Sequence, residues 1–171
     1  MKKPTTLYWT PLILSGAIIA LDQITKYLVT LLIKTDTIAV RLFNNFLWIV
    51  HQRNTGVAFS LGYSAPVFLR VVLFIVLPLV ILTVLGASIM TSKDYTKLQR
   101  WAIAGIIGGG CGNIVDRIFR TEGVVDFISV RFFGLFGLER WPTFNVADSS
   151  VVVCGIILFV SILFMKNKKT S

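Results

Sequence analysis

Four aspartates attract attention because each lies in or beside an apolar stretch. Asp22, Asp116 and Asp148 belong to such stretches, and Asp126 interrupts the β-type run VVDFISV with no adjacent cation. A carboxylate in an apolar setting is costly unless it is paired or used. Two carboxylates a few ångströms apart share a proton, so that one can deprotonate water while the other polarises a carbonyl. The pattern is therefore typical of amide hydrolysis without a metal.

The residues alone leave the identity of the pair open. Asp148 stands at the expected start of a helix, whose N-terminus favours negative charge, so it suits the ionised partner. Asp126 lies among valines, a phenylalanine and an isoleucine, and should keep a proton more readily than Asp116. We expect the neighbouring Arg117 to hold Asp116 ionised in a structural ion pair. These arguments favour Asp126 as the second member, with Asp116 as the rival.

The same residues also have structural interpretations. Asp22 and the lysine four residues later can neutralise each other on one helix face. Asp116 shares a helix face with Asn113 at i, i+3, and the two can belong to a network that fixes helix packing. Asp148 or Asn145 can be the N-cap of a helix, for which Asp and Asn are preferred.

Four apolar stretches must position these side chains. They cover about 8–33, 66–90, 101–119 and 145–165, and a membrane-spanning helix needs roughly 20 residues. The chain has 171 residues, of which 55% are apolar and only 15% charged, well below the charged share of soluble domains. We therefore expect one domain over residues 1–171, an all-α membrane bundle of four transmembrane helices whose first span is retained rather than cleaved.

Two long connections lie on the non-cytoplasmic side of this bundle. The first, about 34–65, contains FLWIV and the turn signal RNTG, and the second, about 120–144, contains GVVDFISVRFFGLFG. We expect each loop to give a strand and the two to form a small β-sheet on the outer surface. The segment AFSLGYSAPVF, residues 58–68, is expected to act as an amphipathic flap that excludes water.

Depth along the helices brings the polar residues to one layer. At a rise of about 1.5 Å per residue, Asn113 and Asp116 lie roughly 18 to 22 Å along the third span, in its outer half. Asp22 reaches a comparable depth, and Asp148 lies in the first turn of the last span. The rival interpretation, a proton- or ion-conducting subunit, needs carboxylates at several depths. The single layer therefore favours an enzyme.

The basic residues flank helix ends, so the net charge of +9 does not indicate a nucleic-acid-binding protein. The two sides carry nearly equal numbers of Lys and Arg, but short loops weigh more than long ones, and we expect both termini in the cytoplasm. Cys111 and Cys154 lie in spans and need no disulfide. A single histidine, His51, argues against a zinc site and against serine-type catalysis, so no metal or cofactor is expected.

Five blocks of the sequence resemble the lipoprotein signal peptidase (signal peptidase II) family. They are LDQITK, RNTGVAFS, GNIVDR, VVDF and FNVAD, in the order and spacing of that family and spread over the whole chain. The resemblance implies a membrane aspartic peptidase that removes the signal peptide from diacylglyceryl-modified prolipoproteins, cutting before the lipidated cysteine. It places the protein in the bacterial cytoplasmic membrane, with the site near the outer face.

The resemblance also implies roles for individual residues. The catalytic pair would be Asp126 and Asp148, and globomycin-type cyclic peptides would be inhibitors. The other signature polar residues would support the site: Asp22, Asn54, Asn113, Asp116, Arg117 and Asn145.

Overall fold

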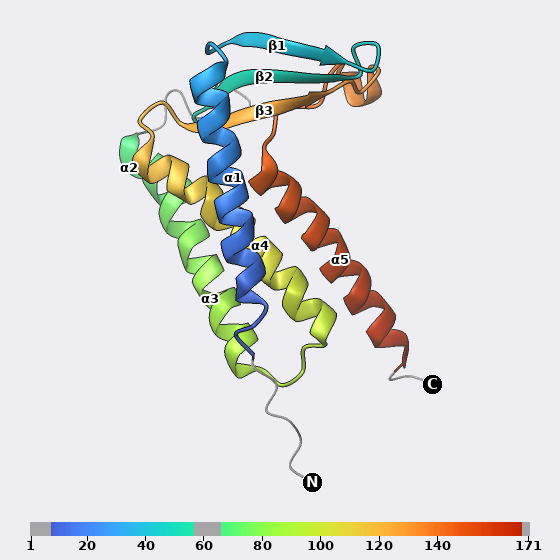
Figure 1. The fold of residues 1–171 in the computed structure, drawn as a ribbon. Coiled ribbons are helices and arrows are strands. Elements are labelled where there is room, and N and C mark those ends of the chain that lie inside the picture. Colours follow the sequence, from blue (N-terminus) through green and yellow to red (C-terminus); the bar gives the residue numbers. More distant parts are fainter. Residues whose placement is uncertain (1–7, 57–65, 169–171) are drawn as a thin grey trace.

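Long helices and one antiparallel sheet make up the part of the chain that the structure describes (Figure 1). This computed structural model describes residues 8–56 and 66–168. The helical elements are α1 (Leu12–Leu32), α2 (Val67–Val71), the π-helical turn η1 (Val72–Val76), α3 (Leu77–Thr91), α4 (Lys97–Phe119), the 3₁₀ turn η2 (Leu135–Gly137) and α5 (Val146–Lys168). The strands are β1 (Thr37–Leu42), β2 (Leu47–Asn54) and β3 (Val124–Val130).

Within those residues, four helical stretches are long and apolar enough to cross a membrane, because α2, η1 and α3 continue one another. The predicted membrane bundle with a small sheet is confirmed, with shifted boundaries. α1 begins at Leu12 rather than near residue 8. α4 begins at Lys97 rather than near residue 101, because Thr96 and Gln99 form a capping box that starts the helix inside the polar turn.

α4 lies at the centre of the bundle and packs against α1, α3 and α5. Its glycines allow this close approach. A Cβ on Gly112 would lie 2.7 Å from an oxygen of Asp22 on α1, and one on Gly108 would lie 2.8 Å from the Cα of Ser15. On the other side, Gly109 lies against the backbone of Ala147 on α5. Small residues at such contacts are the usual means by which membrane helices approach each other.

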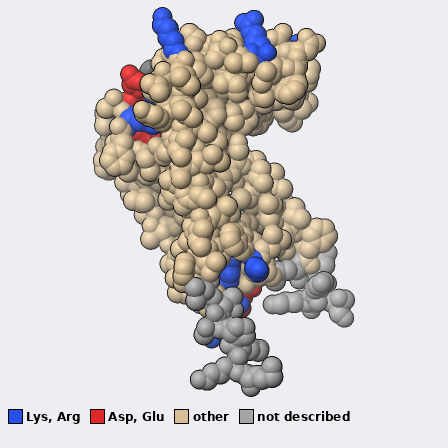
Figure 2. Space-filling view, viewed as in Figure 1, with Lys and Arg blue, Asp and Glu red and all other residues tan. Residues whose placement is uncertain are grey.

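The outer surface of the helices is apolar. Val84 on α3 and Phe159 on α5 are among many large apolar side chains that stay exposed. Figure 2 shows charged side chains gathered at the two ends of the molecule, with an uncharged belt between them. This distribution fits a lipid environment around the belt.

The sheet has the order β1-β2-β3 and is antiparallel throughout. We expected one strand from each outer loop, but the first loop gives two, β1 and β2. β1 is an edge strand whose side chains are exposed except for the half-buried Thr37. α1 begins and α5 ends at the opposite end of the bundle from the sheet (Figure 1). Most of the flap expected over 58–68, residues 58–65, lies outside the described residues.

The turn before β3 brings the sheet onto the helices. Gly123 adopts φ +94°, a conformation that other residues rarely adopt, and a Cβ there would lie 2.6 Å from the carbonyl oxygen of Asn54. β3 then runs from Val124 with its first four residues buried. After β3 the chain returns through Phe144, whose carbonyl accepts from Ile128 N–H at 2.9 Å, and enters α5.

Candidate active site

Asp126 lies on β3 and is almost completely buried, with 1% of its surface exposed. Two amide groups donate to its carboxylate. Asn54 Nδ2 lies 2.9 Å from Oδ2, and Asn145 Nδ2 lies 2.7 Å from Oδ1. The pKa of Asp126 is raised to about 6, mainly by burial and further by the charge of Asp148, while the hydrogen bonds from Asn54 and Asn145 limit the rise. The carboxyl is therefore suited to hold a proton.

Asp148 lies in the first turn of α5, where a helix favours negative charge. It forms a reciprocal cap with Asn145: Asn145 N–H donates to Asp148 Oδ2 at 3.1 Å, and Asp148 N–H donates to Asn145 Oδ1 at 2.9 Å. Asn113 Nδ2 also donates to Asp148 Oδ1 at 2.7 Å. Asn145 is thus the N-cap of α5, which is one of the two predicted alternatives. Asp148 accepts the hydrogen bond from the backbone N–H of this N-cap residue.

Asn145 connects the two aspartates directly. Its side-chain amide donates to Asp126 and its backbone N–H to Asp148. The same Nδ2 lies 3.1 Å from Asn113 Oδ1, which also accepts from Lys26 Nζ at 2.9 Å. Because both of these donors occupy the Asn113 oxygen, its amide nitrogen is directed at Asp148. The two asparagines therefore fix the arrangement of the two carboxylates.

A second polar cluster joins α1 to α4. Lys26 Nζ lies 2.8 Å from Asp22 Oδ2 and 3.0 Å from Asp116 Oδ2, and all three side chains are fully buried. Asp22 also accepts from Ala147 N–H at 3.0 Å, which ties α5 to the cluster. The predicted Asp22–Lys26 pair is therefore confirmed, and it belongs to a network that holds three helices together.

The ion pair expected between Asp116 and Arg117 is wrong. Asp116 pairs with Lys26 and with Arg120, whose Nε lies 3.0 Å away. Neighbouring residues on a helix point in different directions, whereas residues four apart share a face. Arg117 instead lies with its guanidinium 5.4 Å from the centre of the Phe74 ring.

Comparison with known proteins decides the family. The sequence pattern of "Signal peptidase (SPase) II" matches residues 14–164. The chain belongs to the signal peptidase II family. Signal peptidase II is a peptidase, so the chain is an enzyme, and its four apolar spans make it a multi-pass bacterial membrane protein.

Several signal peptidase II relatives resemble the chain over nearly its whole length. The lipoprotein signal peptidase of Treponema pallidum (strain Nichols) is 44% identical over 161 residues, covering 94% of this chain and 86% of that protein. That of Borrelia hermsii (strain HS1 / DAH) is 47% identical over 154 residues, covering 90% and 89%. A solved bacterial membrane enzyme shares the fold with a TM-score of 0.77 at 28% identity, covering 94% of this chain and 91% of that one.

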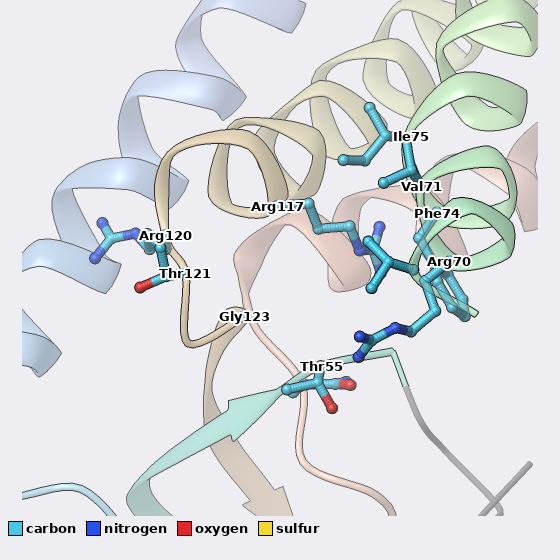
Figure 3. Close-up of a pocket in the computed structure, with 11 residues that line it drawn as sticks. Thr55, Arg70, Val71, Phe74, Ile75, Arg117, Arg120, Thr121 and Gly123 are labelled. Atoms are coloured by element: carbon cyan, nitrogen blue, oxygen red, sulfur yellow. The ribbon is translucent and has the colours of Figure 1, made fainter. Parts of the chain in front are cut away.

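A cavity of about 280 Å³ lies beside the aspartates of this signal peptidase II chain. Asn54, which donates to Asp126, is one of its lining residues. Figure 3 shows the side chains of Arg70 and Arg117 extending from facing helices toward the same space above Thr55. All the residues that the resemblance implied for the site therefore lie at the aspartate pair, in the adjoining Asp22–Lys26 network or on this cavity.

Other chemistry has no comparable basis in the described residues. His51 is buried on β2, where its Nδ1 lies 2.7 Å from the Ile33 carbonyl oxygen, so it joins the sheet to the end of α1. Across residues 8–56 and 66–168, no group of three His, Cys, Asp or Glu side chains lies close enough to hold a metal ion. Cys111 and Cys154 are both free.

Two polar residues of the network were not predicted. Gln23 Nε2 bridges Asp22 and Asp116 at 3.2 and 3.1 Å. The second is Arg120, whose Nε lies 3.0 Å from Asp116 Oδ1. The i, i+4 spacing of Asp116 and Arg120 could have indicated this pair from the sequence, whereas the direction of Gln23 depends on how α1 and α4 pack.

Proposed function

We propose that this signal peptidase II chain is a membrane aspartic endopeptidase of 171 residues forming one domain. It removes the signal peptide from diacylglyceryl-modified prolipoproteins by cutting before the lipidated cysteine. The observation that carries the proposal is the Asn145 bridge, which joins Asp126 to Asp148 at the end of the bundle that carries the sheet. The lipoprotein signal peptidases of the relatives support the substrate class.

Asp148 acts as the general base in this mechanism. The start of α5, Asn145 N–H and Asn113 Nδ2 all stabilise its ionised form. It takes a proton from water, whose oxygen attacks the carbonyl carbon of the scissile amide. Asp126 is the protonated partner and donates to the carbonyl oxygen as charge develops there.

Collapse of the intermediate breaks the C–N bond. Asp148 gives its proton to the departing nitrogen of the lipidated cysteine, and one hydroxyl of the diol intermediate returns a proton to Asp126. The water oxygen stays on the signal peptide as part of the new carboxyl group, whose remaining proton passes to the amine, so both aspartates regain their starting states. No covalent enzyme intermediate is needed, and the supporting side chains Asp22, Asn54, Asn113, Asp116 and Arg117 keep their places.

The position of the pair suits a substrate that is partly in lipid. The apolar segment of a signal peptide would lie along the lipid-facing helices, with the cut at the membrane boundary and the acyl chains still in the bilayer. Membrane lipid is therefore a partner, and we propose that globomycin-type peptides bind at the same site. The protein would lie in the bacterial cytoplasmic membrane with the site near the outer face and both termini in the cytoplasm.

Replacing either aspartate by asparagine tests the proposal. In purified full-length protein, Asp126→Asn and Asp148→Asn should each lower the rate of cleavage of a lipid-modified precursor by at least about 100-fold, because each removes a proton-transfer group. Asp36→Asn is the matched control, since Asp36 is exposed on the same side and its φ of 59° suits asparagine. Cleavage by either test variant at the rate of the control would reject the assignment.

A further inference from the structure

The cavity beside the aspartates is lined by both apolar and cationic side chains. Val67, Val71 and Phe74 come from the α2–η1 stretch, and Val67 and Val71 are exposed on the surface of the helices. Arg70 and Arg117 come from α2 and α4. A cavity of this composition suits an anionic group attached to an apolar chain.

The two guanidiniums lack acceptors in the described part of the chain. The Nε atoms of Arg70 and Arg117 are buried and have no hydrogen-bond partner there, and neither side chain has an ion pair there. Arg120 lines the same cavity but is engaged by Asp116 at 3.0 Å. A buried guanidinium N–H without an acceptor is costly, and a ligand oxygen that accepts from it removes that cost.

The proposed reaction creates one new anion at this place. Hydrolysis of the amide turns a neutral carbonyl into the carboxylate at the C-terminus of the released signal peptide. This carboxylate forms beside Asp148, whose negative charge repels it as soon as it is ionised. Lys26 is already engaged by Asp22 and Asp116.

We propose that Arg70 and Arg117 bind the new C-terminal carboxylate of the cleaved signal peptide and draw it away from the aspartates. The proposal rests on the proposed function. Guanidinium groups match carboxylates with paired hydrogen bonds, which favours this role for arginine over a simple positive charge. Asn54 lies between the two sites because it both donates to Asp126 and lines the cavity. The exposed Val67 and Val71 give the apolar product a way into the lipid.

The test compares two synthetic product peptides that end at the residue before the cysteine, one a free acid and one a C-terminal amide. Both are used as inhibitors of precursor cleavage by full-length protein in detergent. The acid should inhibit wild type about tenfold more strongly than the amide, as expected for hydrogen bonds to a charged group. Arg70→Gln should bring the ratio of the two inhibition constants close to one, and Arg70→Lys should restore part of it.

Arg41→Gln is the matched control, because Arg41 lies on the sheet and outside the cavity. Its guanidinium is 5.2 Å from the centre of the Trp48 ring. It should leave the ratio unchanged. The inhibition constant of the amide, measured on each variant, shows whether the rest of the site is intact. Equal inhibition by acid and amide in wild type, or an unchanged ratio in Arg70→Gln, would overturn the proposal.

Inorganic phosphate and phosphatidylglycerol vesicles form the last arms of the test. Either one could inhibit precursor cleavage by wild type but not by Arg70→Gln, while the acid and amide peptides inhibit equally. In that case the cavity is a phosphate or lipid-headgroup site and the proposal is wrong. Absence of precursor cleavage without inhibitor would instead reject the proposed function itself, so the two failures are distinguishable.

Discussion

At the scale of single residues, the amide donors around Asp126 adjust its proton affinity. Burial raises its pKa to about 6, and Asn54 is the strongest of the groups that lower it. If Asp126 acts as the protonated partner, activity requires its acid form. The proton is lost as the pH rises through the pKa, so kcat/KM should fall on the alkaline side of about pH 6.

Asn54→Ala tests this assignment. Removal of the donor destabilises the ionised form of Asp126, so its pKa rises and the acid form persists to higher pH. The alkaline limb of the kcat/KM profile should therefore move to higher pH, even though the maximal rate falls. Gln52→Ala is the control, because Gln52 faces Asp126 across the sheet but its side chain accepts from Thr143 instead. A limb that moves to lower pH in Asn54→Ala, or does not move, would show that Asp126 is not the proton donor.

At the residue scale, some contacts of the site can be predicted from the sequence and others cannot. The Asp22–Lys26 pair follows from i, i+4 spacing within one helix and was predicted. The partners of Asp116 were not, because Lys26 reaches it from another helix at 3.0 Å. The convergence of Asp126 and Asp148 was inferred from depth and family resemblance, yet the asparagines that join them act across β3, α4 and α5. Such contacts depend on packing that one sequence does not specify.

At the scale of elements, the cluster of Lys26, Asp22 and Asp116 joins α1 to α4. It gives Asp116 a structural role that differs from the role proposed for the catalytic aspartates. Asp116 is fully buried and accepts from Lys26, Arg120, Gln23 and the N–H of Val125. Removing one partner from a buried ionic network leaves the other charge uncompensated. Asp116 therefore holds helices in place.

Asp116→Asn should lower the free energy of unfolding by about 3 kcal/mol, measured as a lower melting temperature in detergent. Cleavage per folded molecule should fall much less than in Asp126→Asn. Glu122→Gln is the control, because the Arg53–Glu122 pair has a largely exposed carboxylate, and it should change the stability by less than about 1 kcal/mol. An unchanged melting temperature with full loss of cleavage would move Asp116 into the catalytic pair and revive it as the rival of Asp126.

The elements themselves were predictable to different degrees. Long apolar runs predict the four spans, because a bilayer demands about 20 apolar residues whatever the helices pack against. β1 was missed because it is an exposed edge strand, and its sequence TIAVRL shows no buried face. β2 and β3 carry the buried Val50 and Val125, and their β-branched runs were recognised. Burial is what leaves a pattern in the sequence.

At the scale of the whole molecule, the bundle has two chemically different ends. One carries the sheet and the aspartates, and the other carries the short turn between α3 and α4 (Figure 1). Basic residues lie in this turn (Lys93) and at the start of α4 (Lys97 and Arg100). The guanidinium of Arg100 lies 4.2 Å from the centre of the Tyr8 ring, which ties the segment before α1 to the start of α4. Basic residues in short connections favour the cytoplasm, so the sheet should face outward.

Cysteine labelling with a membrane-impermeant maleimide tests this orientation in full-length protein. Glu139→Cys, at an exposed position beyond β3, should be labelled in right-side-out membrane vesicles, and Lys93→Cys only in inverted ones. The unsubstituted chain is the background control, because Cys111 and Cys154 lie within α4 and α5 and should react little in either. The reverse pattern would place Asp126 and Asp148 at the cytoplasmic boundary. A precursor whose cut site lies at the outer face could not then reach them, so the orientation is a condition of the proposed function.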